Sequence, residues 1–159
     1  MTNPTDIQSL QVLLKHAEGD RDAALLALQQ AQARADAART QAEQLAAYRG
    51  DYQRRWTQQF AQRSAIEIVH CYQGFNDRLQ QAITHQDNAS AQCSAQLENA
   101  RRLLQERELR VASVRRLIER RRLEQRRAEE RRDQKLTDEA AQRSGWNTAL
   151  PSRMVNQFS

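Results

Sequence analysis

Histidines and cysteines are the side chains of this 159-residue chain best suited to hold a metal or attack a substrate. His16, His70 and His85 never stand four residues apart, and only His70 adjoins a cysteine, Cys71. A structural zinc site needs about four converging nitrogen or sulfur ligands, and the sequence offers no such set. It also has no glycine-rich phosphate loop and no recognisable nucleophile–base motif. We therefore expect no enzyme activity, no cofactor and no metal.

Aromatic residues gather in one stretch of the sequence instead. Six of the eight lie between positions 48 and 75, namely Tyr48, Tyr52, Trp56, Phe60, Tyr72 and Phe75. Two interpretations remain open. The rings either pack together as a plug that closes a bend, or some of them stay exposed and form a docking surface for a protein.

Arginine supplies the second group of candidate residues. The chain carries a net charge of +5, and residues 115–135 alone hold ten basic and five acidic side chains. Pairs four residues apart, such as Arg120/Glu124 and Arg126/Glu130, stabilise a solvated helix by roughly 0.2–0.5 kcal/mol each. The remaining positive charge predicts an acidic partner. A protein is favoured over nucleic acid because acids are interspersed and no aromatics interleave.

Two heptad seams predict the elements that position these residues. Residues that step by four and three from Leu10 to Trp56 are apolar at twelve of fourteen positions. A second, less apolar seam steps in phase from Leu79 to Ile118. Such repeats are typical of helices that pack along one stripe. We therefore expect an all-α fold, a coiled coil of two long helices.

Capping residues set the expected helix ends, because both prolines lie near the ends of the chain. Ser64 to Glu67 has the pattern of a capping box, Thr5 to Gln8 a similar one, and Gly145 suits a C-terminal stop. The predicted elements are a helix over about 5–58, a turn over about 59–64 and a helix over about 65–143.

A short turn between long helices implies an antiparallel hairpin, here over residues 1–143. Folding about residue 61 sets residues whose numbers sum to about 122 opposite each other. Ile118 then faces the start of the first helix, and the basic segment 115–135 becomes an unpaired overhang. The alternative is a parallel dimer of one long helix, which needs the seam to continue in phase through 57–65.

Composition excludes other classes of protein. Ala, Arg, Gln, Leu and Glu supply 96 of the 159 residues and aromatics 5%, which is typical of long helices and too poor in bulky side chains for a compact core. No apolar run approaches the roughly 20 residues of a membrane span. The start lacks the features of a signal peptide. Cys71 and Cys93 are too far apart on a straight helix for a disulfide, so we expect a reduced, cytosolic protein.

Ordered motifs within this pattern resemble one known family. Tyr48-Arg49-Gly50-Asp51-Tyr52, Tyr72-Gln73-Gly74-Phe75 and Asp133-Gln134-Lys135 stand at the order and spacing of the FliJ family of flagellar type III export proteins. The resemblance covers roughly residues 10–143. It implies a two-helix antiparallel coiled coil similar to the central stalk of rotary ATPases. The injectisome stalk proteins are the alternative of the same class, and an Arg-rich nucleic-acid-binding adaptor is the alternative of another.

The resemblance also implies partners and a location. The partners are the export ATPase ring and its regulator, the cytoplasmic domain of the export gate, and export chaperones, with no nucleic acid. The location is the cytoplasm, peripheral to the inner membrane at the flagellar base.

Site residues follow from the same resemblance. Carried over by motif, the surface that binds the export gate falls on Gln41, Leu45, Tyr48, Tyr52, Phe75, Leu79, Ala82 and Gln86. We expect the ATPase ring to meet Arg116, Arg120, Arg127 and Arg131. The tail 144–159 departs from the family pattern. We expect it to be disordered, with a small docking motif of Trp146, Leu150 and Met154 as the alternative.

Overall fold

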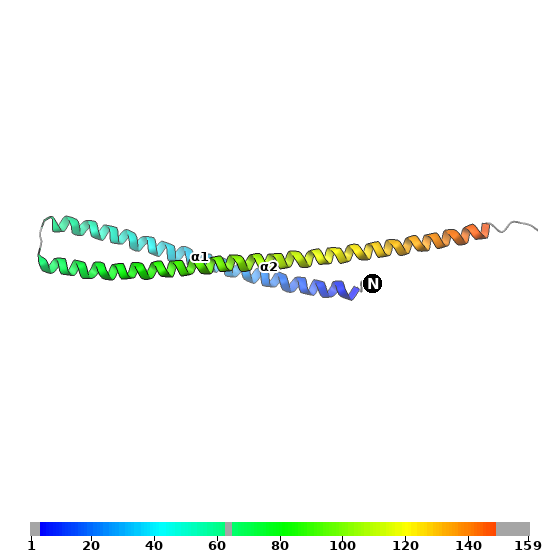
Figure 1. Ribbon diagram of the computed structural model, residues 1–159, viewed down its shortest axis with the longest axis horizontal. Coiled ribbons are helices and arrows are strands. Elements are labelled where there is room, and N and C mark those ends of the chain that lie inside the picture. Colours follow the sequence, from blue (N-terminus) through cyan, green and yellow to red (C-terminus); the bar gives the residue numbers. More distant parts are fainter. Residues whose placement is uncertain (1–3, 63–64, 149–159) are drawn as a thin grey trace, which may run out of the picture. The chain divides into compact units, whose positions relative to one another are not determined.

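The protein consists of long α-helices. A computed structural model describes residues 4–62 and 65–148, and these residues form helix α1 (Pro4–Phe60) and helix α2 (Ile66–Thr148), with no strand among them (Figure 1). The predicted all-α fold of two long helices is confirmed. By their contacts the residues fall into a hairpin unit, 16–111, and a terminal unit that combines 1–15 with 112–159.

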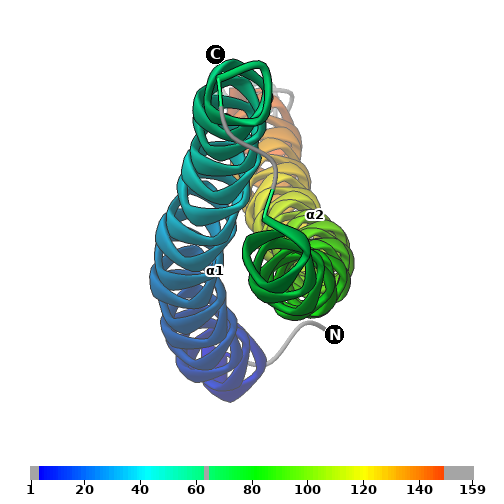
Figure 2. The same cartoon turned by 90° about the vertical axis from the view of Figure 1, so that its left-hand side faces the viewer.

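In the hairpin unit, α1 and α2 lie side by side and run in opposite directions; Figure 2 views this unit from its turn end. Gln86 of α2 donates to the backbone oxygen of Ala38 in α1 at 3.1 Å. Further along, the Arg107 guanidinium lies 3.5 Å from the Asp20 carboxylate. The alternative of one uninterrupted helix is therefore wrong, because the chain folds back after Phe60.

The seams form the interface between the helices. All fourteen positions of the first seam and all twelve of the second are buried or half-buried. Alanines hold much of the α1 side, with Ala17 only 2% exposed, whereas α2 contributes Leu79, Ile83, Leu97 and Val111. Small side chains on one helix leave room for larger ones on the other, so this thin core packs without bulky residues on both sides.

The pairing register differs from the predicted one. Gln86 bonds to Gln41, Arg107 pairs with Asp20, and Arg121 pairs with Asp6, so facing residues sum to 127 rather than 122. The reason lies in the turn: α1 runs to Phe60 and α2 begins at Ile66, which places the centre of the connection near residue 63. Residues 61–65 contain no glycine or proline, so nothing in the sequence marked the exact position of the turn.

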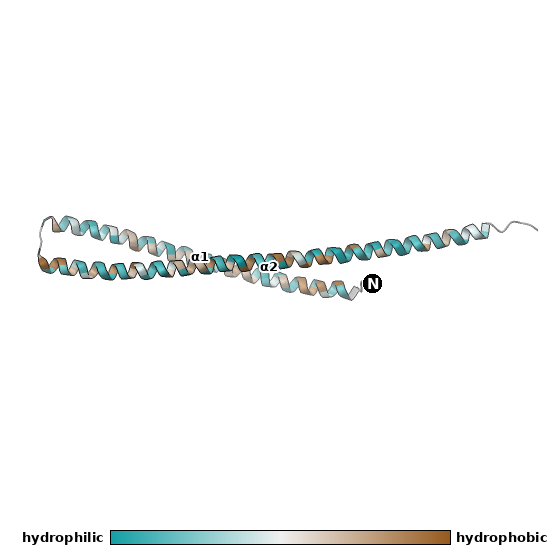
Figure 3. Ribbon diagram, in the orientation of Figure 1, coloured by the Kyte–Doolittle hydropathy of each residue, from teal (hydrophilic) through white to brown (hydrophobic). Residues whose placement is uncertain are grey.

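In the terminal unit, the register shift lengthens the paired part of α2. Val114 and Ile118 are buried, and Arg121 reaches Asp6 at 3.7 Å. Gln125 and Ala128 are still half-buried, whereas every residue from 129 to 148 is exposed. The overhang predicted at 115–135 therefore begins later, after Ala128. Figure 3 shows this last part of α2 mostly in teal, the colour of hydrophilic residues.

The helix ends also differ in detail from the prediction. α2 continues to Thr148, so Gly145 lies within the helix instead of ending it. No described glycine has a positive φ, and a glycine inside a helix costs only about 1 kcal/mol, which neighbouring residues can offset. The proposed cap Ser64 and the tail from 149 onward lie outside the described residues, while Trp146 is helical and exposed. Within the described part of the chain, neither helix is apolar over a stretch long enough to cross a bilayer.

Candidate protein-docking site

Aromatic side chains from both helices meet at the turn end of the hairpin unit. Tyr52 is central, with its ring centroid 4.5 Å from that of Phe75 and 5.6 Å from that of Tyr72. Trp56 lies 5.3 Å from both Phe60 and Tyr72. Heptad spacing on α1 and the return of the chain in α2 bring these rings into contact, and ring pairs at such distances are worth about 0.5–1.5 kcal/mol each.

The cluster has features of both interpretations, the plug and the exposed surface. Tyr52, Trp56, Phe60, Tyr72 and Phe75 are half-buried against one another and close the bend. Tyr48 differs, since it stacks on Tyr52 at 6.3 Å and stays 53% exposed. The plug therefore accounts for five rings, and the sixth extends the cluster onto the surface.

The eight residues expected to bind the export gate fall on one side of the hairpin unit. At about 100° per residue, Gln41, Leu45, Tyr48 and Tyr52 span about 60° of α1. Leu45 and Tyr52 belong to the seam, and Gln41 and Tyr48 border it. Phe75, Leu79, Ala82 and Gln86 span about the same arc of α2 on the matching side. Contacts between Tyr52 and Phe75 and between Gln41 and Gln86 join the two arcs. We call this continuous surface the docking flank.

A shallow depression marks the centre of the docking flank. Its volume is about 490 Å³, and it is lined by Gln41, Gln44, Leu45, Tyr48 and Gln86. Four of these five are among the residues carried over from the family motif. The lining combines an exposed aromatic edge with amide groups, which suits a partner that brings one apolar side chain and a few polar atoms.

Individual members of the docking flank have different exposure. Gln41, Tyr48 and Ala82 are exposed, and a partner can contact them directly. Leu79 is only 7% exposed, so it supports the surface from beneath. Gln86 is half-buried, and its amide nitrogen already makes two hydrogen bonds within the protein. It donates to Ala38 O at 3.1 Å and to Gln41 Oε1 at 3.2 Å. The side chain of Gln86 thereby fixes the register and the orientation of Gln41.

Three further residues belong to this surface and were not predicted. Gln44 lines the depression, three residues after Gln41 and four before Tyr48. On α2, stepping back from Phe75 by four and three gives Cys71 and Ile68, both exposed. Helical spacing alone could have found them, because residues three and four apart share a face.

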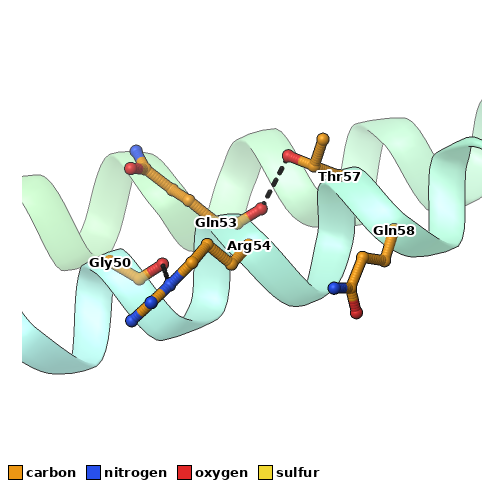
Figure 4. Close-up of a pocket in the computed structure, with 5 residues that line it drawn as sticks. All are labelled: Gly50, Gln53, Arg54, Thr57 and Gln58. Carbon is orange, nitrogen blue, oxygen red and sulfur yellow. Dashed lines mark hydrogen bonds between the residues drawn. The ribbon is translucent and has the colours of Figure 1, made fainter.

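The opposite side of α1 is polar. Figure 4 shows a depression there lined by Gly50, Gln53, Arg54, Thr57 and Gln58, with the Thr57 hydroxyl donating to the Gln53 backbone oxygen at 2.8 Å. Arg54 Nε donates to the backbone oxygen of Gly50 at 3.4 Å, and the Arg54 guanidinium also pairs with the Asp51 carboxylate. This side has no aromatic residue in its lining and its charges are paired, so the docking flank is the distinctive one.

Two polar atoms lie buried in the seam at the same level. Arg49 Nε and Asn76 Oδ1 have no hydrogen-bond partner in the part of the chain that the structure describes. Their numbers sum to 125, close to the register, so a donor and an acceptor share one layer between the helices. Each such unpaired atom costs about 1–3 kcal/mol.

The arginines expected to meet the ATPase ring share one face of α2. Arg116, Arg120, Arg127 and Arg131 are all exposed and span about 60° around the axis, well away from the buried face. Arg131 Nε donates to Arg127 O at 3.2 Å, and both line a shallow depression with Glu130 and Gln134. We call these four residues the arginine ridge.

Ion pairs near the arginine ridge differ from those expected. Glu124 pairs with Arg121 at 3.6 Å, three residues before it, instead of with Arg120. Arg121 also reaches Asp6, so this carboxylate–guanidinium group ties α1 to α2. As a result, Arg120 keeps its charge available on the exposed face.

The remaining candidates for chemistry do not converge. His16, His70 and His85 are exposed, and Cys71 and Cys93 are both free thiols. Among residues 4–62 and 65–148, no three His, Cys, Asp or Glu side chains come together as a metal-binding group.

The class of this protein is an antiparallel helical coiled coil with an aromatic cluster at its turn end. Within that class, the chain belongs to the FliJ family: the family model, described as the flagellar FliJ protein, matches residues 6–149. The resemblance seen in the sequence motifs is thus confirmed. FliJ proteins are non-enzymatic, and this chain is a component of the flagellar protein export apparatus. No curated protein and no solved structure matches it.

Proposed function

We propose that the chain is an adaptor of flagellar protein export that binds the cytoplasmic domain of the export gate through the docking flank. The observation that carries the proposal is Tyr48, an exposed ring stacked on a packed aromatic cluster beside a depression. Exposed aromatics anchored on rigid elements are typical of the residues that dominate binding energy in interfaces.

In this proposal the arginine ridge makes the second contact, by binding the export ATPase ring. Four guanidinium groups on one exposed face of α2 suit an acidic surface on the partner, because Arg pairs bidentately with carboxylates. The proposal further includes the regulator of the ATPase and the export chaperones as partners. It places the protein in the cytoplasm, held at the inner membrane at the flagellar base by its partners alone.

Alanine substitutions test the contact with the gate. Tyr48→Ala with Phe75→Ala removes the exposed ring and the ring that supports Tyr52, so gate affinity should fall at least tenfold while helicity is retained. Phe60→Ala is the matched control, because Phe60 belongs to the plug but not to the docking flank. It should lower thermal stability and leave gate affinity nearly unchanged. Equal gate binding by the double variant and the wild type would favour a purely structural role for the cluster.

Charge reversal tests the contact with the ring. Arg127→Glu with Arg131→Glu should weaken binding to the ATPase ring and reduce stimulation of ATP hydrolysis, and reversing all four ridge residues should abolish both. Arg122→Glu with Arg126→Glu is the control, since these exposed arginines have the same spacing about 140° further around α2. If the control pair has as large an effect as the ridge pair, only net charge matters and the ridge assignment is wrong.

A further inference from the structure

Two arginines border the docking flank. Arg55 follows Tyr52 by three residues on α1, and Arg78 follows Phe75 by three residues on α2. Residues three apart on a helix are neighbours on its surface. Tyr52 and Phe75 are the ring pair in closest contact, at 4.5 Å. Each ring of this central pair therefore has an exposed guanidinium one turn further along its helix, so the two charges stand on opposite helices, diagonally across the docking flank.

Neither of these arginines is neutralised by a carboxylate among residues 4–62 and 65–148. Arg55 makes no hydrogen bond or ion pair with any residue that the structure describes, and Arg78 donates only Nε, to Gly74 O at 3.2 Å. Other arginines of the hairpin unit do hold carboxylates; those are Arg21, Arg39, Arg54, Arg101 and Arg107.

Nearby acids do not compensate the two charges. Asp51, the acid closest to Arg55 on α1, pairs with Arg54. Asp77, the residue before Arg78, lies about 100° further around α2, on the side away from the docking flank. Glu67 lies in the first turn of α2, eleven residues before Arg78, which is about 16 Å along the helix. The docking flank therefore combines an aromatic centre with a positive rim.

The backbone oxygen of Gly74 holds the side chain of Arg78 in place. A Cβ at this position would meet nothing within 4 Å, so close packing does not require the glycine. The same bond forms between Arg131 Nε and Arg127 O at 3.2 Å, so a glycine is not needed for it either. The bond through Nε holds the side chain along the helix and leaves both Nη atoms free to donate to a carboxylate.

We propose that Arg55 and Arg78 recognise carboxylates that border an apolar side chain in the docked segment of the partner. This proposal rests on gate binding at the docking flank and adds the chemistry of the partner: an acidic protein segment with an apolar or aromatic centre. The rim is exposed, so its charges act mainly by accelerating association and by setting its salt dependence.

Association kinetics with the cytoplasmic domain of the export gate test this proposal. Arg55→Glu with Arg78→Glu should lower the association rate constant about tenfold at low ionic strength and flatten its dependence on salt, with little change in the dissociation rate. Arg54→Glu with Arg102→Glu makes the same change in net charge at exposed positions off the docking flank, and it should stay within about twofold of the wild type. Arg55→Lys with Arg78→Lys should retain most of the association rate.

The outcomes separate this inference from the function on which it rests. If the Glu variants associate as fast as the wild type while Tyr48→Ala with Phe75→Ala weakens binding, the gate contact stands and the role of the rim is wrong. Equal slowing by the control pair also overturns it, because net charge then explains the effect. If the wild-type protein does not bind the gate domain at all, the proposed function and this inference fail together.

Discussion

Arg49 and Asn76 show at the residue scale that the seam does not optimise stability alone. Both residues bury one polar atom without a partner in the described structure, in the layer beneath the docking flank. Gln86, in contrast, uses its amide nitrogen for two hydrogen bonds to α1. A satisfied polar residue in a coiled coil can fix its register, whereas an unsatisfied one only costs free energy in the isolated chain.

A substitution at Arg49 measures that cost. Arg49→Met keeps the aliphatic stem in the seam and removes the unpaired donor, so the free energy of unfolding should rise by about 1–3 kcal/mol. Arg39→Met is the control, because Arg39 is exposed and its pair with Asp36 is a surface pair worth less than about 1 kcal/mol. Chemical denaturation followed by circular dichroism gives both values. A fall in stability for Arg49→Met would mean that Arg49 contributes favourably through its other nitrogens.

At the element scale, α2 contains two stretches with different sources of stability. Residues around Val111, Val114 and Ile118 are buried against α1 in the unit to which each belongs, whereas residues 129–148 are exposed on all sides. Most of the stability of helices in proteins comes from tertiary packing of one face, and the exposed stretch has no such packing. The exposed stretch therefore depends on its own helix propensity.

Hydrogen exchange tests this difference within one helix. Backbone amides of residues 129–148 should exchange within seconds to minutes at neutral pH, while amides near Val114 and Ile118 should be protected by at least a hundredfold more. Asp6→Ala provides the control: it removes the pair with Arg121 and should deprotect residues near 121 without affecting 129–148. Strong protection of 129–148 in the purified protein would indicate that this stretch is packed, for example against a second copy.

Particular residues show how far the sequence predicted these elements. Heptad spacing identified every seam position from Leu10 to Trp56, because helical period alone decides which residues face a neighbour. The turn was placed about two residues too early, since no glycine or proline marks it and capping patterns locate helix ends only loosely. That small shift changed the pairing by five residues, and with it the start of the overhang.

The candidate site was predictable in part for similar reasons. Motif spacing placed the eight residues of the docking flank, but it did not show that Leu79 is buried or that Gln86 is bonded across to α1. Arg55 and Arg78 were missed because their importance depends on two facts outside the sequence. One is that Tyr52 meets Phe75 across the helices, and the other is that Asp51, the acid closest to Arg55 on α1, pairs with Arg54.

At the scale of the whole molecule, α2 is the element common to both units. It is one continuous helix from Ile66 to Thr148, so it carries part of the docking flank in the hairpin unit and the arginine ridge in the terminal unit. If the protein couples the gate to the ATPase ring as proposed, continuity of α2 between the two sites is required in addition to the sites themselves.

Breaking α2 between the two sites tests that requirement. Ala112 is exposed at the boundary of the units, and Ala112→Pro there should kink the helix, at a cost of about 3 kcal/mol or more. We expect the variant to bind the isolated gate domain and the isolated ATPase ring with affinities within about threefold of the wild type, because the proline touches neither the docking flank nor the arginine ridge. Swimming in soft agar should nevertheless be lost. Ala112→Ser keeps the helix and should swim normally; full motility of Ala112→Pro would show that the two contacts act independently and that no coupling passes through α2.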